Sequence, residues 1–129
     1  MIEVLVSLVL ITVGVLSLLS LLPAGWRLSG ISDHLGRAAG ILQAELERNE
    51  IMIMNGNNPI TPTPVPPPSK TVYGSGKVTA QPGDLLYTVS TEVASLGASY
   101  RVRVQVTWPG NTTGIAESLI VGRQMFFAQ

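Results

Sequence analysis

The chain carries few side chains of the kinds that perform catalysis. Its 129 residues include one histidine, His34, and no cysteine. The sequence has no serine in a nucleophile-elbow pattern, no glycine-rich phosphate loop and no acid pair spaced for a common pocket. A single histidine, without cysteine or a second histidine nearby, also argues against a metal site. We therefore expect a protein that is not an enzyme and that uses no cofactor or metal ion.

Glu3 is the ionisable residue whose position most needs an explanation. It precedes a segment, Val4 to Trp26, that contains no charged residue, and the first basic side chain in the sequence is Arg27. A carboxylate at the edge of a hydrophobic helix is costly where lipid or apolar protein excludes water, so Glu3 needs a cationic partner. The nearest cation is an α-amino group at Met1, which belongs either to the same chain or to a neighbouring copy in an assembly.

Residues 1–26 are predicted to form a hydrophobic helix that spans a membrane or lies in the core of a filament. About 20 apolar residues are needed to cross a bilayer, and the run from Val4 to Leu22 reaches that length. A secretory signal has a shorter apolar region with basic residues in front of it, whereas an acid stands in front of this one. Pro23 and Gly25 follow the run. Because proline removes one helical hydrogen bond, we expect a kink or a melted stretch around residues 19–25.

The first ten residues carry a recognisable pattern. The sequence begins MIEVLVSLVL, in which the pair Ile2-Glu3 opens a largely apolar run. This start resembles that of mature type IV pilins and type II secretion pseudopilins, whose helix opens with Phe-Thr-Leu-Ile-Glu before a similar run. Counted back from Glu3, the chain begins two residues short of the family's Phe-Thr.

The resemblance implies a specific role for Glu3 and a specific location of the chain before and after assembly. In the family, the corresponding glutamate neutralises the N-terminal amine of an adjoining subunit during assembly, which places Glu3 and Met1 at the assembly contact. A prepilin peptidase and the pilus assembly machinery are implied as partners. The chain is then expected to be a single-pass protein of the inner membrane before it enters an extracellular filament.

Residues 27–54 are predicted to continue the helix with an amphipathic pattern. Apolar residues recur at three- and four-residue steps and line one stripe, whereas charged residues occupy the other faces. This stripe favours a helix packed under a globular head over a simple tether. Its members are Leu28, Ile31, Leu35, Ala38, Leu42 and Leu46, and Ile51 to Met54 are expected to form a core-facing end. The run from Asn55 to Pro59 then predicts the end of the helix.

Residues 55–70 are predicted to form an exposed loop rich in proline and threonine. Residues 59–68 contain six of the nine prolines and should adopt an extended, polyproline-like conformation. A linker between helix and sheet is the favoured interpretation, and a ligand for a proline-recognising domain is the alternative. Thr61 and Thr63 are candidate glycosylation sites in this loop. Asn111 is another, because Asn111-Thr112-Thr113 matches the acceptor pattern in a predicted turn.

Residues 71–129 are predicted to form an antiparallel sheet. Four segments have strand character, and turn residues separate them at Pro82–Asp84, Ser95–Ala98 and Pro109–Gly114. The segments are Thr71–Ala80, Leu85–Ala94, Tyr100–Trp108 and Ser118–Phe127. Alternation in the third places Val102, Val104 and Val106 on one face, which should cover the helix. The expected fold is α+β, with a long N-terminal helix packed on a four-stranded antiparallel sheet.

These features predict a structural subunit of a type IV pilus-like filament, a homo-oligomer assembled by bundling of the N-terminal helices. A pilus component is favoured over the alternatives of a minor pilin or a secretion pseudopilin. An alternative from another class is a monomeric, membrane-anchored binding module outside the cytoplasm. Eight basic and eight acidic residues cancel, so the charge gives no indication of a nucleic-acid partner. Glu3 discriminates between filament and anchor, because an anchor does not need it.

Overall fold

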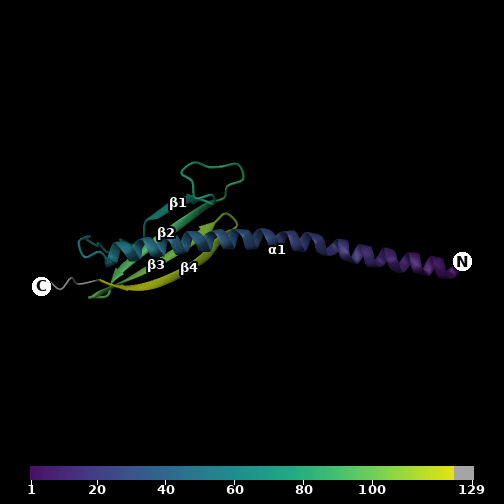
Figure 1. The fold of residues 1–129 in the computed structure, drawn as a ribbon, viewed down its shortest axis with the longest axis horizontal. Coiled ribbons are helices and arrows are strands. Elements are labelled where there is room, and N and C mark those ends of the chain that lie inside the picture. The colour runs from purple at the N-terminus through teal and green to yellow at the C-terminus, as the bar shows by residue number, and fades with distance from the viewer. Residues whose placement is uncertain (124–129) are drawn as a thin grey trace. The chain divides into compact units, whose positions relative to one another are not determined.

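The computed structural model describes residues 1–123, and its elements follow the predicted order of one long helix and four strands (Figure 1). The helix is α1, and the strands are β1 to β4, with the bounds Ile2–Met54, Ser69–Tyr73, Leu86–Ser95, Ser99–Trp108 and Asn111–Gly122. The strands lie in the sheet in sequence order, and all neighbouring strands are antiparallel. The predicted α+β fold is confirmed. The chain divides into two units, Met1–Leu35 and Gly36–Gln129, and the second contains the sheet with the part of α1 that packs on it.

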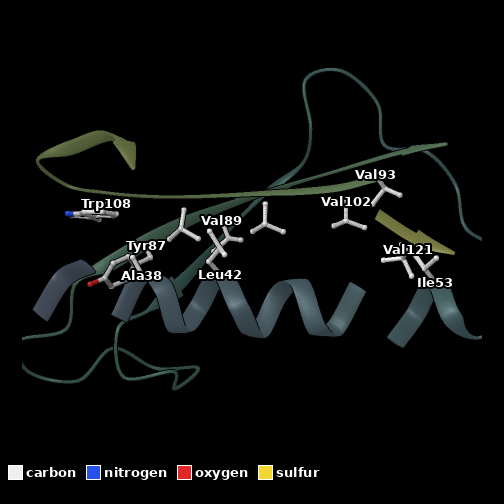
Figure 2. Packing of buried hydrophobic residues seen from close by; sticks show 11 residues of the cluster. Ala38, Leu42, Ile53, Tyr87, Val89, Val93, Val102, Trp108 and Val121 are labelled. Carbon is white, nitrogen blue, oxygen red and sulfur yellow. The ribbon is translucent and has the colours of Figure 1, made fainter. Parts of the chain in front are cut away.

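One hydrophobic core lies between the sheet and the second half of α1 (Figure 2). Val102, Val104 and Val106 of β3 are fully buried in it, as the alternation predicts. Arg101 and Arg103 lie on the opposite face of the same strand and are exposed. Because successive residues of a strand point to opposite faces, one local pattern fixes both the buried and the wet side of β3.

The helix contributes only part of its predicted stripe to this core. Ala38 and Leu42 are buried and Leu46 is half-buried, whereas Leu28 and Ile31 are 68% and 53% exposed. The core begins at Ala38 and includes no residue from 28 to 35. The expectation that the whole stripe packs under the sheet is therefore wrong for residues 28–35. Periodicity predicts which residues share a face of a helix. How many of them are buried depends on which ones pack against the sheet.

The C-terminal end of α1 is where the turn residues predict it. The helix ends at Met54, and the amide of Asn58 donates a hydrogen bond to the backbone oxygen of Met52 at 3.3 Å. Ile53 is buried and Met54 is half-buried against the core. Ile51 and Met52 are exposed, so the predicted core-facing end is right for two of its four residues.

Arg123 ties the end of β4 to the turn that follows α1. Its guanidinium Nη2 donates to the backbone oxygen of Gly56 at 2.8 Å and also to that of Asn58. Charge-assisted hydrogen bonds of this kind are about twice as strong as neutral ones. A chain without cysteine has no disulfide to close this end of the sheet, and the arginine makes the connection instead.

The first strand is earlier and shorter than predicted. β1 spans Ser69–Tyr73, and residues 74–85 form a loop where a strand was expected to continue to Ala80. Gly76 and Gly83 have φ angles of 71° and 84° in this loop. Positive φ is incompatible with an extended strand, which explains why the pattern breaks here although Val78 and Thr79 have strand propensity.

The last strand begins seven residues earlier than predicted. β4 starts at Asn111, directly after a two-residue turn of Pro109 and Gly110, and predicted strand residues 124–127 lie outside the described residues. Gly114, expected in the turn, lies within β4 next to a register shift of β3. A Cβ at Gly114 would lie 1.9 Å from the backbone oxygen of Val106, so only glycine fits. The residue types from Asn111 to Gly114 are typical of a turn, but a β-bulge at this position lets the same residues belong to a strand.

The proline-rich loop is pinned to β2. The backbone N–H of Thr63 donates to the oxygen of Val93 at 3.0 Å, and the N–H of Val93 donates to the Thr63 hydroxyl at 2.9 Å. The N–H of Thr91 donates to the oxygen of Pro68 at 3.4 Å. β1 pairs only with the first half of β2, and the loop thus covers part of the remaining edge.

Asp84 closes the loop between β1 and β2. Its carboxylate accepts hydrogen bonds from the Ser75 hydroxyl at 2.6 Å, the Ser75 N–H at 3.0 Å and the Gln81 N–H at 2.8 Å. The bonds from the Ser75 hydroxyl and the Gln81 backbone hold the pKa of Asp84 below its ordinary value of 3.8. Hydrogen bonds to the charged form favour ionisation, so the loop is closed most firmly when Asp84 is a carboxylate.

We expect this loop to open as the pH falls. Because the pKa of Asp84 is lowered on folding, its contribution to stability is complete above 3.8 and is lost as the pH falls through the folded-state pKa. An NMR titration of the Asp84 carboxyl carbon should have its midpoint below 3.8, and the amide protons of Ser75 and Gln81 should titrate with it. In Asp84→Asn that shared transition should vanish. A midpoint at or above 3.8 would contradict the assignment.

Candidate functional site

The candidate site is the exposed first part of α1. Every residue from Met1 to Asp33 is exposed, and the apolar side chains of this stretch cover all of its faces. Leu5, Leu10 and Leu18, for example, are 65%, 67% and 69% exposed. α1 is long and apolar enough near the N-terminus to cross a membrane, by length and composition alone. A water-exposed helix with apolar side chains all round requires lipid or other protein chains as its surroundings.

Three of the four hydroxyl side chains inside the apolar run Val4–Leu22 donate hydrogen bonds to the helix backbone. The Thr12 hydroxyl donates to the backbone oxygen of Leu8 at 2.6 Å, and the Ser17 hydroxyl donates to that of Val13 at 2.9 Å. The Ser20 hydroxyl donates to the oxygen of Ser17 at 2.7 Å. Hydroxyls satisfied by the preceding turn carry little cost in an apolar environment. The segment is therefore chemically suited to both a bilayer and a bundle of helices.

Glu3 lies in the first turn of α1 and is exposed, as is Met1. Within residues 1–123, Glu3 makes no hydrogen bond or ion pair through its side chain. The backbone oxygen of Met1 accepts a hydrogen bond from the N–H of Leu5 at 3.4 Å, which starts the helix. The arrangement thus leaves a carboxylate open to a cation from outside the chain, at the end of the helix where the macrodipole favours an acid.

Pro23 and Gly25 lie inside α1 and do not interrupt it. Residues 19–25 are helical throughout, so the expected melted stretch is wrong, whereas the kink stays a prediction. Proline lacks the N–H that would bond to the preceding turn, yet one missing bond is tolerated when helix residues continue on both sides. The apolar and amphipathic parts are consequently joined by continuous helix.

The candidate glycosylation residues lie in different surroundings. Thr61 is exposed in the proline-rich loop. Thr63 is half-buried, and its hydroxyl is occupied by the hydrogen bond from Val93, so a sugar there would require that bond to break. Asn111 begins β4 instead of lying in a turn, and its side-chain oxygen accepts the N–H of Gly114 at 2.9 Å. Of the three, Thr61 has the most accessible side chain.

A groove between α1 and β4 is a feature that the sequence analysis missed. It lies wholly in the second unit and encloses about 480 Å³. Its large apolar lining residues are Leu42, Leu46, Ile115 and Leu119, and its carboxylates are Glu47, Glu50 and Glu117. No basic residue lines it. We call it the α1–β4 groove.

Glu117 has an unusual place in this groove. The register pairs it with Val104, between the pairs Val106–Ile115 and Val102–Leu119, so it lies on the helix-facing side of β4. Its side chain is exposed and makes no ion pair in the part of the chain that the structure describes. The alternation Ile115-Glu117-Leu119 would have indicated this position, but it was concealed because the strand was expected to begin only at Ser118.

Comparison with other proteins does not assign the chain. No protein-family model, curated protein or solved structure matches it. Among residues 1–123, no group of three or more histidine, aspartate or glutamate side chains is arranged to hold a metal ion. The chain's own residues, above all the exposed helix and Glu3, therefore carry the argument about function.

Proposed function

We propose that the chain is a structural subunit of a type IV pilus-like filament, held by α1 in the inner membrane before assembly. The observation that carries the proposal is an apolar, fully exposed helical segment that begins with an unpaired carboxylate, Glu3. The apolar segment by itself requires only a membrane. The carboxylate in addition requires a cation, and no basic side chain precedes Arg27.

The energetics favour a specific contact at Glu3. Lipid tails are as apolar as leucine, so moving a helix from lipid into a bundle gains little from the hydrophobic effect, and packing and polar contacts decide the association. An ion pair between Glu3 and the terminal amine of a neighbour would satisfy both charges in an environment without water. Because the two groups are at the same end of the helix, the pair also sets the stagger between copies.

Within this proposal, the resemblance of the N-terminus favours a pilus component, with a minor pilin or a secretion pseudopilin as alternatives. The prepilin peptidase and the assembly machinery are the expected partners. A monomeric, membrane-anchored binding module is the alternative from a different class. A membrane-anchored module accounts for the apolar helix equally well, but it does not explain why a carboxylate lies at residue 3.

Microscopy of filaments tests the proposal. Surface material sheared from cells that make the wild type, Glu3→Gln or Glu3→Asp is imaged with an antibody to the sheet domain. We expect labelled fibres for the wild type and, in reduced number, for Glu3→Asp, which keeps the charge. For Glu3→Gln we expect the fibres to be lost while the protein remains in the membrane fraction.

Two other outcomes have distinct meanings. Wild-type label that stays in the membrane and never appears on fibres would overturn the filament function and favour the anchored module. Fibres in normal number from Glu3→Gln would retain the filament but remove the role of Glu3 in its assembly.

A further inference from the structure

The α1–β4 groove and the segment of α1 that precedes the core residues in sequence have complementary properties. Leu28, Ile31 and Leu35 form the uncovered part of the apolar stripe, and all three are at least 40% exposed. Arg27 precedes Ile31 by four residues and so flanks the stripe. It is the only arginine or lysine in residues 1–35.

The groove offers what this segment lacks. Its lining combines four large apolar side chains with three carboxylates and no base. Its helical wall, Ala39–Glu50, is about 17 Å long at 1.5 Å per residue, whereas Leu28 to Leu35 spans about 11 Å. The stripe therefore fits along the groove, with Arg27 within reach of an acidic wall. The same carboxylates disfavour an anionic lipid surface as the occupant, because like charges repel.

We propose that the α1–β4 groove of one copy binds residues 27–35 of a second copy, with Arg27 of the second copy beside Glu117 of the first. This contact rests on the proposed filament function, which brings copies side by side. It explains two features that the isolated chain leaves open. One is an amphipathic stripe that extends beyond its own core, and the other is a glutamate on the helix-facing side of β4.

Cross-linking between copies tests the contact. The chain has no cysteine, so every thiol can be placed at will. Cells produce one copy with Ile31→Cys and another with Gln43→Cys, a groove residue, and a short bifunctional maleimide is applied to membranes and to sheared fibres. Since neither copy has two thiols, a mixed dimer must join different copies. The matched control replaces Ile31→Cys by Ser29→Cys, which lies on another face of the helix.

Charge reversal tests the pair itself in the same assay. Arg27→Glu and Glu117→Arg should each lower the yield of the mixed dimer by about tenfold, because each places like charges together. The double variant restores opposite charges and should return the yield to near that of the unreversed pair. Near-UV circular dichroism checks that Glu117→Arg keeps the sheet domain folded.

The outcomes separate this contact from the filament function. Fibres that contain the chain, with no more mixed dimer from Ile31→Cys than from Ser29→Cys, would overturn the contact and keep the filament. Failure of the double variant to restore the yield would overturn the Arg27–Glu117 pair. A mixed dimer found in membranes without any fibres would support the contact between copies and overturn the filament.

Discussion

Val104→Asp is expected to unfold the sheet domain. Val104 is fully buried in the centre of β3, between Val102 and Val106. An aspartate there must either bury a charge without a partner or bind a proton, and in both cases the core loses an apolar side chain. Substitutions of this type cost more than about 4 kcal/mol, which approaches the whole stability of a small domain, about 5–15 kcal/mol.

The measurement follows Trp108, which packs on Tyr87 with ring centroids 6.0 Å apart. Trp26→Phe leaves Trp108 as the only tryptophan, so fluorescence and near-UV circular dichroism in detergent report on the core alone. Arg101→Asp is the matched control, because it places the same side chain on the exposed face of the same strand. It should change the free energy of unfolding by no more than about 0.5 kcal/mol. Equal effects of the two variants would refute the assignment of the two faces of β3.

Removal of residues 1–28 is expected to release the chain from membranes while the sheet domain stays folded. The removed part contains no member of the hydrophobic core. Residues 4–22 include 14 valine, leucine and isoleucine residues, which together favour insertion by roughly 4–8 kcal/mol before the polar residues are counted. Loss of that free energy should move nearly all of the protein from the detergent phase to the aqueous phase.

Detergent phase separation measures this shift, and the fluorescence of Trp108 in the same sample shows whether the core is intact. A chain in which residues 4–22 are shuffled at constant composition is the control, and it should stay in the detergent phase because partition depends on composition more than on order. A truncated chain that remains with the detergent would show that another surface binds the membrane. A truncated chain that is soluble but unfolded would show that the fold of the sheet domain depends on residues 1–28.

The local elements of the fold could be predicted because their causes lie in short stretches of sequence. The length of an uncharged apolar run predicts the exposed helix, the alternation from Arg101 to Val106 predicts the faces of β3, and the residues after Met54 predict the end of α1. Each depends on residues within one continuous stretch of the sequence. The position of Glu3 before this run was evident for the same reason.

The bounds of β1 and β4 could not be predicted in the same way. Gly76 and Gly83 turn the chain where the residue types still favour a strand, and Gly114 continues a strand where the residue types favour a turn. In both cases the backbone conformation depends on contacts between residues that are not neighbours in the sequence. Asp84 closes the first loop, and the close approach to Val106 requires the glycine in the second.

The sequence by itself determined that this chain has an apolar helix with an acid at its start and a small α+β domain behind it. Only the tertiary structure decided which parts of the helical stripe are covered. Leu28 and Leu42 belong to the same pattern, yet Leu28 is 68% exposed and Leu42 is 5% exposed. Burial depends on where the sheet ends, and that position is set by pairings between residues far apart in the chain. The same pairings place Glu117 in the α1–β4 groove, a position that stayed hidden because β4 was expected to begin only at Ser118.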